Sequence, residues 1–171
     1  MQLPNPETLL AEITAKIQTQ LEINGAPNTA LVGIHCGGVW LMQRILASTK
    51  QDVAHGMLDA ALYRDDYAQR GLKTEPKPSN IAFDVTDKHI ILIDDIFYTG
   101  RTTRAAMNEL FDYGRPASIT LAVLINRGGA ELPIVPNIVG ANIVLKPNQD
   151  LQLTQDAGGK LLLSLQKASH V

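Results

Sequence analysis

Apolar residues recur along the chain with the periods of amphipathic helices and of buried strands. At the N-terminus, Asn5-Pro6-Glu7 combines a capping residue, a proline suited to the first helical position and a first-turn acid. Apolar side chains then follow at four-residue spacing, which predicts a helix with one apolar face. The elements predicted next are the end of this helix near Asn24-Gly25, a strand at 30–34, a helix at about 39–48 and a strand at 57–62.

The second half of the chain continues this alternation. Residues 90–93, Ile-Ile-Leu-Ile, are the strongest strand signal, and this strand is expected to end at Asp94-Asp95. The further elements predicted are a helix at 102–113, strands at 119–125 and 138–144, and strands at 151–153 and 161–165 joined by a Gly158-Gly159 hairpin turn. Because strand and helix alternate from 30 to 125, we predict an α/β fold with a parallel sheet flanked by helices. One domain is expected to span residues 1–171.

Ligands of a parallel sheet bind beyond the carboxyl ends of its strands. Three loops of this sequence meet that condition, at 35–38, 94–101 and 126–130. Residues 64–80 are polar, with both signs of charge and few apolar side chains. A polar stretch of this length inside a compact domain is typical of a functional lid or of a disordered excursion.

Composition narrows the class of protein. The 171 residues are 45% hydrophobic and 19% charged, which excludes disorder of the whole chain. Neither a membrane-length apolar run nor a secretory leader is found, so a cytoplasmic location without membrane contact is expected. The single cysteine, Cys36, excludes an internal disulfide and a cysteine-based zinc site. The net charge is −2, so the chain does not have the excess of basic residues that is typical of nucleic-acid-binding proteins. A local stripe of basic residues stays an open alternative.

The chemistry is concentrated in residues 90–102. An apolar strand leads to the carboxylates of Asp94 and Asp95, and a small polar loop then opens into a helix start. Free amides at a helix start, together with the Thr99 and Thr102 hydroxyls and Gly100, suit a phosphate group. The two carboxylates can accept hydrogen bonds from vicinal sugar hydroxyls. The segment therefore predicts a pocket for a ribose 5-phosphate.

These thirteen residues resemble the phosphoribosyl pyrophosphate (PRPP) motif of type I phosphoribosyltransferases. Over roughly residues 30–143 the chain resembles the PyrR family, pyrimidine operon regulators that have uracil phosphoribosyltransferase activity. The resemblance is carried by residues 62–66, 99–102, 104–107, 114–116, 127–128 and 131–134. It implies a type I phosphoribosyltransferase-like fold with a flexible hood loop at about 64–80, and it suggests a homo-oligomer.

The resemblance also implies a Mg²⁺-dependent pentosyl transfer in which uracil and PRPP give UMP and pyrophosphate. Asp94 and Asp95 would be the catalytic pair that holds the ribose hydroxyls and stabilises oxocarbenium-like charge. Mg²⁺ would bind through the substrate. The other assigned residues are Tyr98, Thr99, Gly100, Arg101 and Thr102 for the 5-phosphate, Cys36, Gly37, Gly38 and Arg64 for pyrophosphate, and Ile125, Asn126 and Arg127 for the nucleobase.

Three positions depart from the family pattern. Many members have Thr-Arg-Gly where this chain has Cys36-Gly37-Gly38, so backbone amides rather than an arginine would hold pyrophosphate here. Known members of the family have Asp where this chain has Asn126 and Arg where it has Ala130. Both positions lie in the loop expected to bind the nucleobase, so these differences are expected to alter which base is selected.

Two alternatives to the enzyme follow. The first is a UMP- or PRPP-sensing regulator that binds pyrimidine-operon messenger RNA; it ranks second because the first 30 residues hold only Lys16 against Glu7, Glu12 and Glu22. The second is a sensor that binds nucleotide without turnover, since the pyrophosphate loop lacks its arginine.

Overall fold

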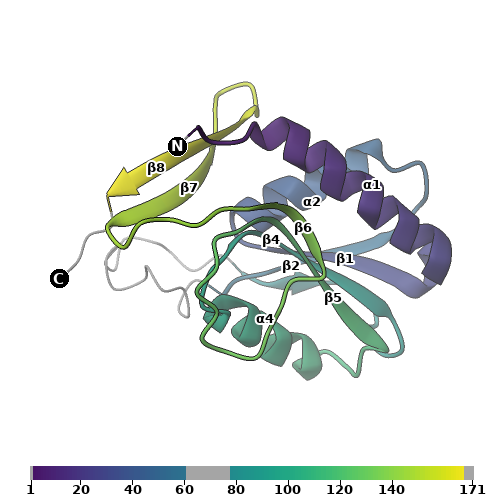
Figure 1. Ribbon diagram of the computed structural model, residues 1–171. Coiled ribbons are helices and arrows are strands. Elements are labelled where there is room, and N and C mark those ends of the chain that lie inside the picture. The colour runs from purple at the N-terminus through teal and green to yellow at the C-terminus, as the bar shows by residue number, and fades with distance from the viewer. Residues whose placement is uncertain (1, 61–77, 168–171) are drawn as a thin grey trace.

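The computed structural model describes residues 2–60 and 78–167, which form a six-stranded sheet with helices on both faces and a separate two-stranded sheet (Figure 1). The large sheet has the order β3-β2-β1-β4-β5-β6, and every pairing in it is parallel except β2 with β3. The helices are α1 (Pro6–Asn24), the 3-10 turn η1 (Ala26–Asn28), α2 (Gly37–Ser48) and α4 (Arg101–Asp112). The strands are β1 (Thr29–Ile34), β2 (Ala54–Leu58), β3 (Asn80–Ile81), β4 (His89–Phe97), β5 (Ser118–Asn126), β6 (Ile138–Asn142), β7 (Gln149–Gln155) and β8 (Leu161–Lys167). The predicted α/β fold is confirmed.

Helix α1 forms as its end signals predict. The Asn5 side chain accepts a hydrogen bond from the Glu7 amide at 2.9 Å, and the Gly25 amide closes the last turn on Leu21 O. The four-residue apolar spacing becomes a fully buried stripe of Leu9, Ile13, Ile17 and Leu21. This stripe places α1 against the sheet.

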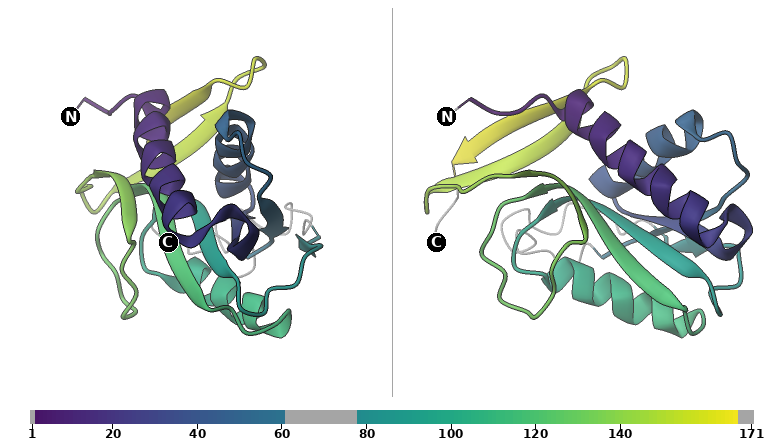
Figure 2. Two further views of the ribbon diagram at one scale, coloured as in Figure 1. Left: turned by 90° about the vertical axis from the view of Figure 1, so that its right-hand side faces the viewer. Right: turned by 45° about the vertical axis from the view of Figure 1, so that its right-hand side comes forward.

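The sheet separates two apolar layers. α1 and α2 cover one face and α4 covers the other (Figure 2). Side chains of β4 alternate between the layers: Ile91 and Ile93 pack on the α1 and α2 side, whereas Ile90 and Leu92 pack on the α4 side. Each such side chain contributes about 1.5–3 kcal/mol on burial, so β4 is anchored from both faces. Of the described residues, no helix has both the length and the apolar character needed to cross a membrane.

Several strand boundaries differ from the prediction, and strand pairing explains those of β2 and β4. The strand expected at 57–62 is β2 at Ala54–Leu58, because its register is set by pairing with β1, from Ala30 with Ala54 to Ile34 with Leu58. The strand expected to end at Asp94-Asp95 continues to Phe97, because β5 pairs with it that far. Both corrections come from hydrogen-bonding partners, which apolar runs do not specify.

The predicted hood loop falls almost entirely on residues 61–77, which lie outside the described part of the chain, and so does Arg64. Its last residues lead into the short strand β3, which pairs antiparallel with β2.

The β7–β8 hairpin confirms the predicted turn at Gly158-Gly159. The Asp156 carboxylate accepts hydrogen bonds from the Gly158 and Lys160 amides at 2.8 and 2.9 Å, and Gly159 adopts φ +80°. Leu151, Leu153 and Leu161 enter the same core as α1. The hairpin is thus packed onto the domain.

Polar contacts fix the hairpin to both helices on this face. The Glu7 carboxylate accepts a hydrogen bond from the Leu161 amide at 2.9 Å and pairs with Arg44 at 2.7 Å. Arg44 also donates to Gly159 O at 3.2 Å. The hydrogen bond from Arg44 and that from the Leu161 amide hold the pKa of Glu7 below its ordinary value of 4.5.

Replacing Glu7 by Gln should therefore destabilise the protein by about 1 kcal/mol at pH 7, which lowers Tm by about 2–4 °C for a chain of this size. A carboxyl group whose pKa is lowered in the folded state stabilises the fold at pH values above its ordinary pKa. This stabilisation is lost as the pH falls through the lowered pKa. The difference from wild type should therefore shrink below about pH 4.5, as measured by thermal unfolding across pH. Glu22→Gln, at an exposed position of the same helix, is the matched control and should leave Tm at pH 7 close to that of wild type.

Candidate active site

Residues 35–38, which we call the glycine loop, comprise the turn after β1 and the first two residues of α2, and they lie directly on the carboxyl end of β4. A Cβ added to Gly37 would stand 2.3 Å from Asp95 Oδ2, and one added to Gly38 would stand 2.2 Å from Ile93 O. Only glycine permits this approach without displacing its neighbours. The structure therefore brings Gly37 against the Asp95 carboxylate and Gly38 against the backbone of β4 just before the acid pair. Cys36, the residue before α2, is half-buried there.

The acid pair is buried near this edge. Asp94 is 5% exposed and Asp95 is 6% exposed, and the Asp95 amide donates to Asp94 Oδ1 at 2.9 Å. Successive residues of a strand point to opposite faces, so Asp95 shares the α2 side with Ile93 and Asp94 belongs to the α4 side. The two acids thus approach the edge from the two faces of the sheet.

The segment from Tyr98 to Thr102 has the form of an anion cradle. Gly100 adopts the left-handed conformation at φ +92° and directly precedes α4, whose first amides lack partners within the helix. The buried Thr99 hydroxyl accepts a hydrogen bond from the Arg101 amide at 3.3 Å, and Thr99 O accepts from Glu131 and Leu132. Thr102 is half-buried in the first turn. The five residues predicted for the 5-phosphate therefore lie together at one helix start.

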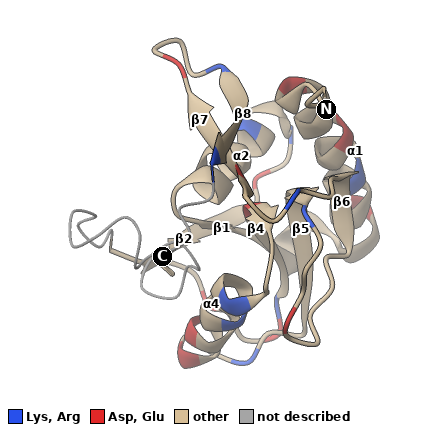
Figure 3. Ribbon diagram, turned by 60° about the vertical axis from the view of Figure 1, so that its left-hand side comes forward, with Lys and Arg blue, Asp and Glu red and all other residues tan. Residues whose placement is uncertain are grey.

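The charges of α4 oppose its own dipole. Arg101 and Arg104 occupy its first turn, and Glu109 and Asp112 lie near its end, as the coloured ribbon of Figure 3 shows. Helices are stabilised by the reverse distribution, with acids first and bases last. The Arg101 side chain pairs with Glu131. Two cations beside the positive end of a helix dipole favour an anion at that end.

The third loop begins at the end of β5. Ile125 is fully buried in the core, so it presents no side chain to a ligand. Asn126 uses both ends of its amide: Nδ2 donates to Asn142 Oδ1 at 3.0 Å and Oδ1 accepts from the Gly128 amide at 3.1 Å. The Arg127 amide donates to Phe97 O at 3.0 Å, which fixes this loop beside the phosphate segment.

The side chain of Arg127 reaches a residue that the sequence did not indicate. Its guanidinium lies 4.0 Å from the centroid of the Tyr98 ring and pairs with Asp150 at 2.5 Å. Asp150 is the second residue of β7, a strand remote in sequence from the PRPP motif, and neither its residue type nor its spacing indicates a role in the site. Glu131 was missed as the partner of Arg101, although it lies within a stretch that carries the family resemblance.

Comparisons with known proteins agree with this geometry. Residues 2–148 match the family described as phosphoribosyl transferase domain. A bifunctional protein PyrR of Pseudomonas syringae pv. tomato is 44% identical over 154 residues, covering 90% of this chain and 91% of the relative. The chain belongs to the PyrR family. A PyrR protein of Nitrosococcus oceani is 43% identical over 161 residues, covering 90% of this chain and 91% of that protein.

Solved structures agree at the level of the fold. A hypoxanthine-guanine phosphoribosyltransferase from Bacillus anthracis superposes with a TM-score of 0.66 at 17% identity, covering 88% of this chain and 86% of that chain. A hypoxanthine phosphoribosyltransferase from Staphylococcus aureus gives a TM-score of 0.63 at 18% identity, with coverage of 88% and 79%. The PyrR family therefore shares its architecture with purine phosphoribosyltransferases.

Gly37→Ala tests the contact between the glycine loop and the acid pair. The added methyl should displace the Asp95 carboxylate, because its carbon would otherwise lie 2.3 Å from Oδ2, well inside van der Waals contact. Overpacking of this kind costs about 1–3 kcal/mol of folding stability. A crystal structure should show the moved side chain, and thermal unfolding should show the lost stability. Gly158→Ala is the control, since its Cβ would meet only the tip of Asp156 at 3.3 Å. An unmoved Asp95 in the Gly37 variant would contradict the contact.

Proposed function

We propose that this protein is a uracil phosphoribosyltransferase that converts uracil and PRPP to UMP and pyrophosphate. The observation that carries the proposal is the buried Asp94-Asp95 pair, placed between a glycine loop and the start of α4 in a chain of the PyrR family. The ribose would lie at the acid pair, with its 5-phosphate at the start of α4 and its pyrophosphate toward residues 36–38. Each of these placements follows from the chemistry of the groups that line it.

The reaction displaces pyrophosphate from the anomeric carbon, which builds positive charge on the ribose as in glycoside cleavage. Carboxylates in a buried setting stabilise such charge more strongly than they do in water. Asp94 and Asp95 would hold the ribose hydroxyls and carry this stabilisation. Fixing the 5-phosphate at residues 98–102 would orient the ring, so that the base and the leaving group lie on opposite sides of the reacting carbon.

Pyrophosphate would be held by the backbone of the loop at Cys36, Gly37 and Gly38, with Arg64 as a further contact from the hood. A Gly-rich loop can bind phosphate oxygens through its amides alone. Bound Mg²⁺ would supply positive charge to offset that of the departing pyrophosphate. Substrate oxygens and water would provide most of the ligands of this ion, with the buried Asp94-Asp95 pair as the adjacent carboxylates.

The nucleobase would bind at residues 125–127. Uracil offers two carbonyl acceptors and N–H donors, which backbone amides and carbonyls of this loop can match. With the Asn126 amide engaged at both ends, its side chain shapes the loop rather than reading the base. Ile125 would contribute its backbone, because its side chain is buried.

A second function is suggested by the word bifunctional in the names of the PyrR relatives, which fits a regulator that binds messenger RNA. RNA binding needs cations that neutralise phosphates. Helix α1 has one basic residue, Lys16, and three acidic ones. The Lys16 ammonium donates a hydrogen bond to Val139 O. We therefore rank RNA binding below the enzyme.

Asp95→Asn should lower uracil turnover by at least about tenfold, because each 1.4 kcal/mol of lost transition-state stabilisation costs one decade. Turnover should be measured at saturating PRPP and Mg²⁺ for uracil, orotate, xanthine and adenine together, with uracil preferred by the wild type. Asp52→Asn, an exposed position far in sequence from the motif, is the control and should retain full activity. Near-normal uracil turnover in a variant with Asn at both 94 and 95 would refute the catalytic assignment.

Because RNA binding ranks below the enzyme, we expect the protein to bind a pyrimidine-operon leader RNA weakly and non-specifically near 150 mM salt. Several phosphate contacts would make affinity fall by roughly 0.7–0.9 decades per contact for each decade of salt. A gel-shift titration with and without UMP, against a scrambled RNA, measures this. UMP-enhanced, sub-micromolar binding of the leader alone would reverse the ranking.

A further inference from the structure

Arg127 is held from three sides. Its guanidinium stacks on the Tyr98 ring at 4.0 Å from the centroid, its Nη1 donates to Asp150 Oδ1 at 2.5 Å, and its Nη2 donates to Gln149 O at 3.3 Å. The Arg127 side chain is 15% exposed, whereas that of Asp150 is 38% exposed. A planar guanidinium with a ring on one face and acceptors at its edge keeps a single orientation.

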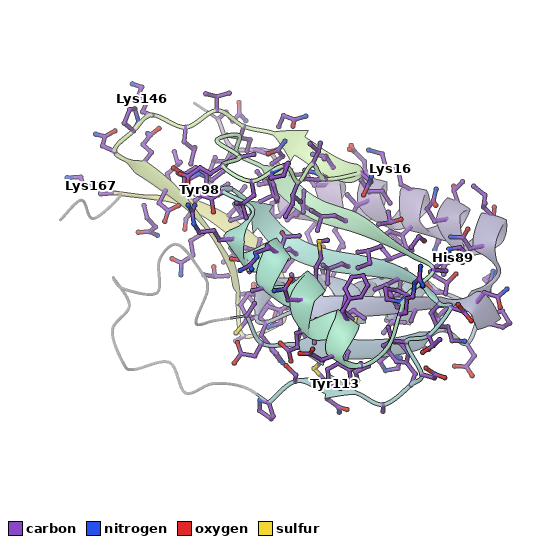
Figure 4. All side chains as sticks on the ribbon, turned by 90° about the horizontal axis from the view of Figure 1, so that it is seen from below. Lys16, His89, Tyr98, Tyr113, Lys146 and Lys167 are labelled. Carbon is purple, nitrogen blue, oxygen red and sulfur yellow. The ribbon has the colours of Figure 1, made fainter. Side chains whose placement is uncertain are left out.

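The three residues come from segments that are remote in sequence. Tyr98 precedes α4, Arg127 follows β5, and Asp150 is the second residue of β7. Figure 4 shows Tyr98 at the same end of the molecule as Lys146, which precedes β7, and Lys167, which ends β8. The match to the phosphoribosyl transferase domain ends at residue 148, so the acid that orients Arg127 lies just beyond it.

Further contacts join this cluster to the nucleobase loop. The Arg127 amide donates to Phe97 O, and a Cβ on Gly129 would stand 2.6 Å from Tyr98 Cε2. Arg127 thus contacts Tyr98 through its side chain and Phe97 through its amide. Gly129 packs against the Tyr98 ring through its backbone. If the guanidinium were released, this loop would lose the side-chain part of its attachment.

We propose that Asp150 is a positioning residue for the nucleobase: its carboxylate holds Arg127 on the Tyr98 ring and so fixes the loop at 126–130. The proposal rests on the proposed function, because it assigns Asp150 to the base end of that same site. The C-terminal hairpin is then part of the binding site. The 5-phosphate is assigned to residues 98–102, which Asp150 reaches through Arg127 and the Tyr98 ring rather than directly, so a ligand without a base should depend much less on Asp150.

Asp150→Asn tests this cleanly. Asparagine keeps Oδ1, which accepts both the Leu151 amide at 2.8 Å and Arg127 Nη1, and it removes the negative charge that faces the guanidinium. Calorimetric Kd values should be measured for UMP and for ribose 5-phosphate, together with KM and kcat for uracil. We expect the UMP Kd and the uracil KM to rise by about tenfold, with kcat and the ribose 5-phosphate Kd within about twofold of wild type.

Three further variants sharpen the outcome. Asp150→Glu restores the charge and should recover most of the affinity for UMP. Arg127→Lys loses the planar stack and should give the same split between UMP and ribose 5-phosphate as Asp150→Asn. Asp112→Asn, exposed at the far end of α4, is the matched control and should leave every constant unchanged.

The two levels of the proposal fail differently. Wild-type protein that turns over uracil, together with an Asp150→Asn variant of unchanged UMP affinity, would overturn the role of Asp150 and leave the enzyme intact. An equal loss of affinity for UMP and for ribose 5-phosphate would show that Asp150 stabilises the whole site, and it would also overturn the role of Asp150 in positioning the nucleobase. Wild-type protein without uracil turnover would overturn the proposed function itself, and the Asp150 proposal with it.

Discussion

The close contact between the glycine loop and the carboxyl end of β4 is the constraint on which the rest of the site depends. Gly38 approaches Ile93 O, and Gly37 approaches the Asp95 carboxylate, at distances that no side chain tolerates. β4 can serve as this fixed surface because β1 and β5 are hydrogen-bonded to its two edges and apolar layers cover its two faces. The acids are therefore presented by the most anchored strand of the molecule.

Around this fixed strand, the remaining loops are tied to one another rather than to the core alone. Thr99 O accepts amides from the segment at 131–132, and the Arg127 amide bonds to Phe97 O. The ion pairs of Arg101 with Glu131 and of Arg127 with Asp150 add side-chain links at the rim. The exposed pair of Arg101 with Glu131 stabilises the fold only slightly, and the partly buried pair of Arg127 with Asp150 orients a guanidinium, so both serve mainly to orient the loops.

The charge arrangement of α4 favours the same conclusion about function. A helix with cations in its first turn and acids near its end gives up dipole stabilisation, at roughly 0.3–1 kcal/mol for each charge. This cost is understandable where the helix start binds phosphate, since the cations and the first-turn amides then act on one anion. Stability and ligand binding thus place opposite demands on the first turn of α4.

The sequence by itself determined the α/β class, the capped first helix, the hairpin turn and the positions of the three loops, because each depends on local periodicity, caps and turn residues. It did not determine the true start of β2, the extension of β4 beyond Asp95 or the link from Arg127 to Asp150. Strand pairing decided the first two, and packing of the hairpin decided the third. Contacts between distant residues depend on which surfaces the folded chain brings together, and no local pattern carries that information.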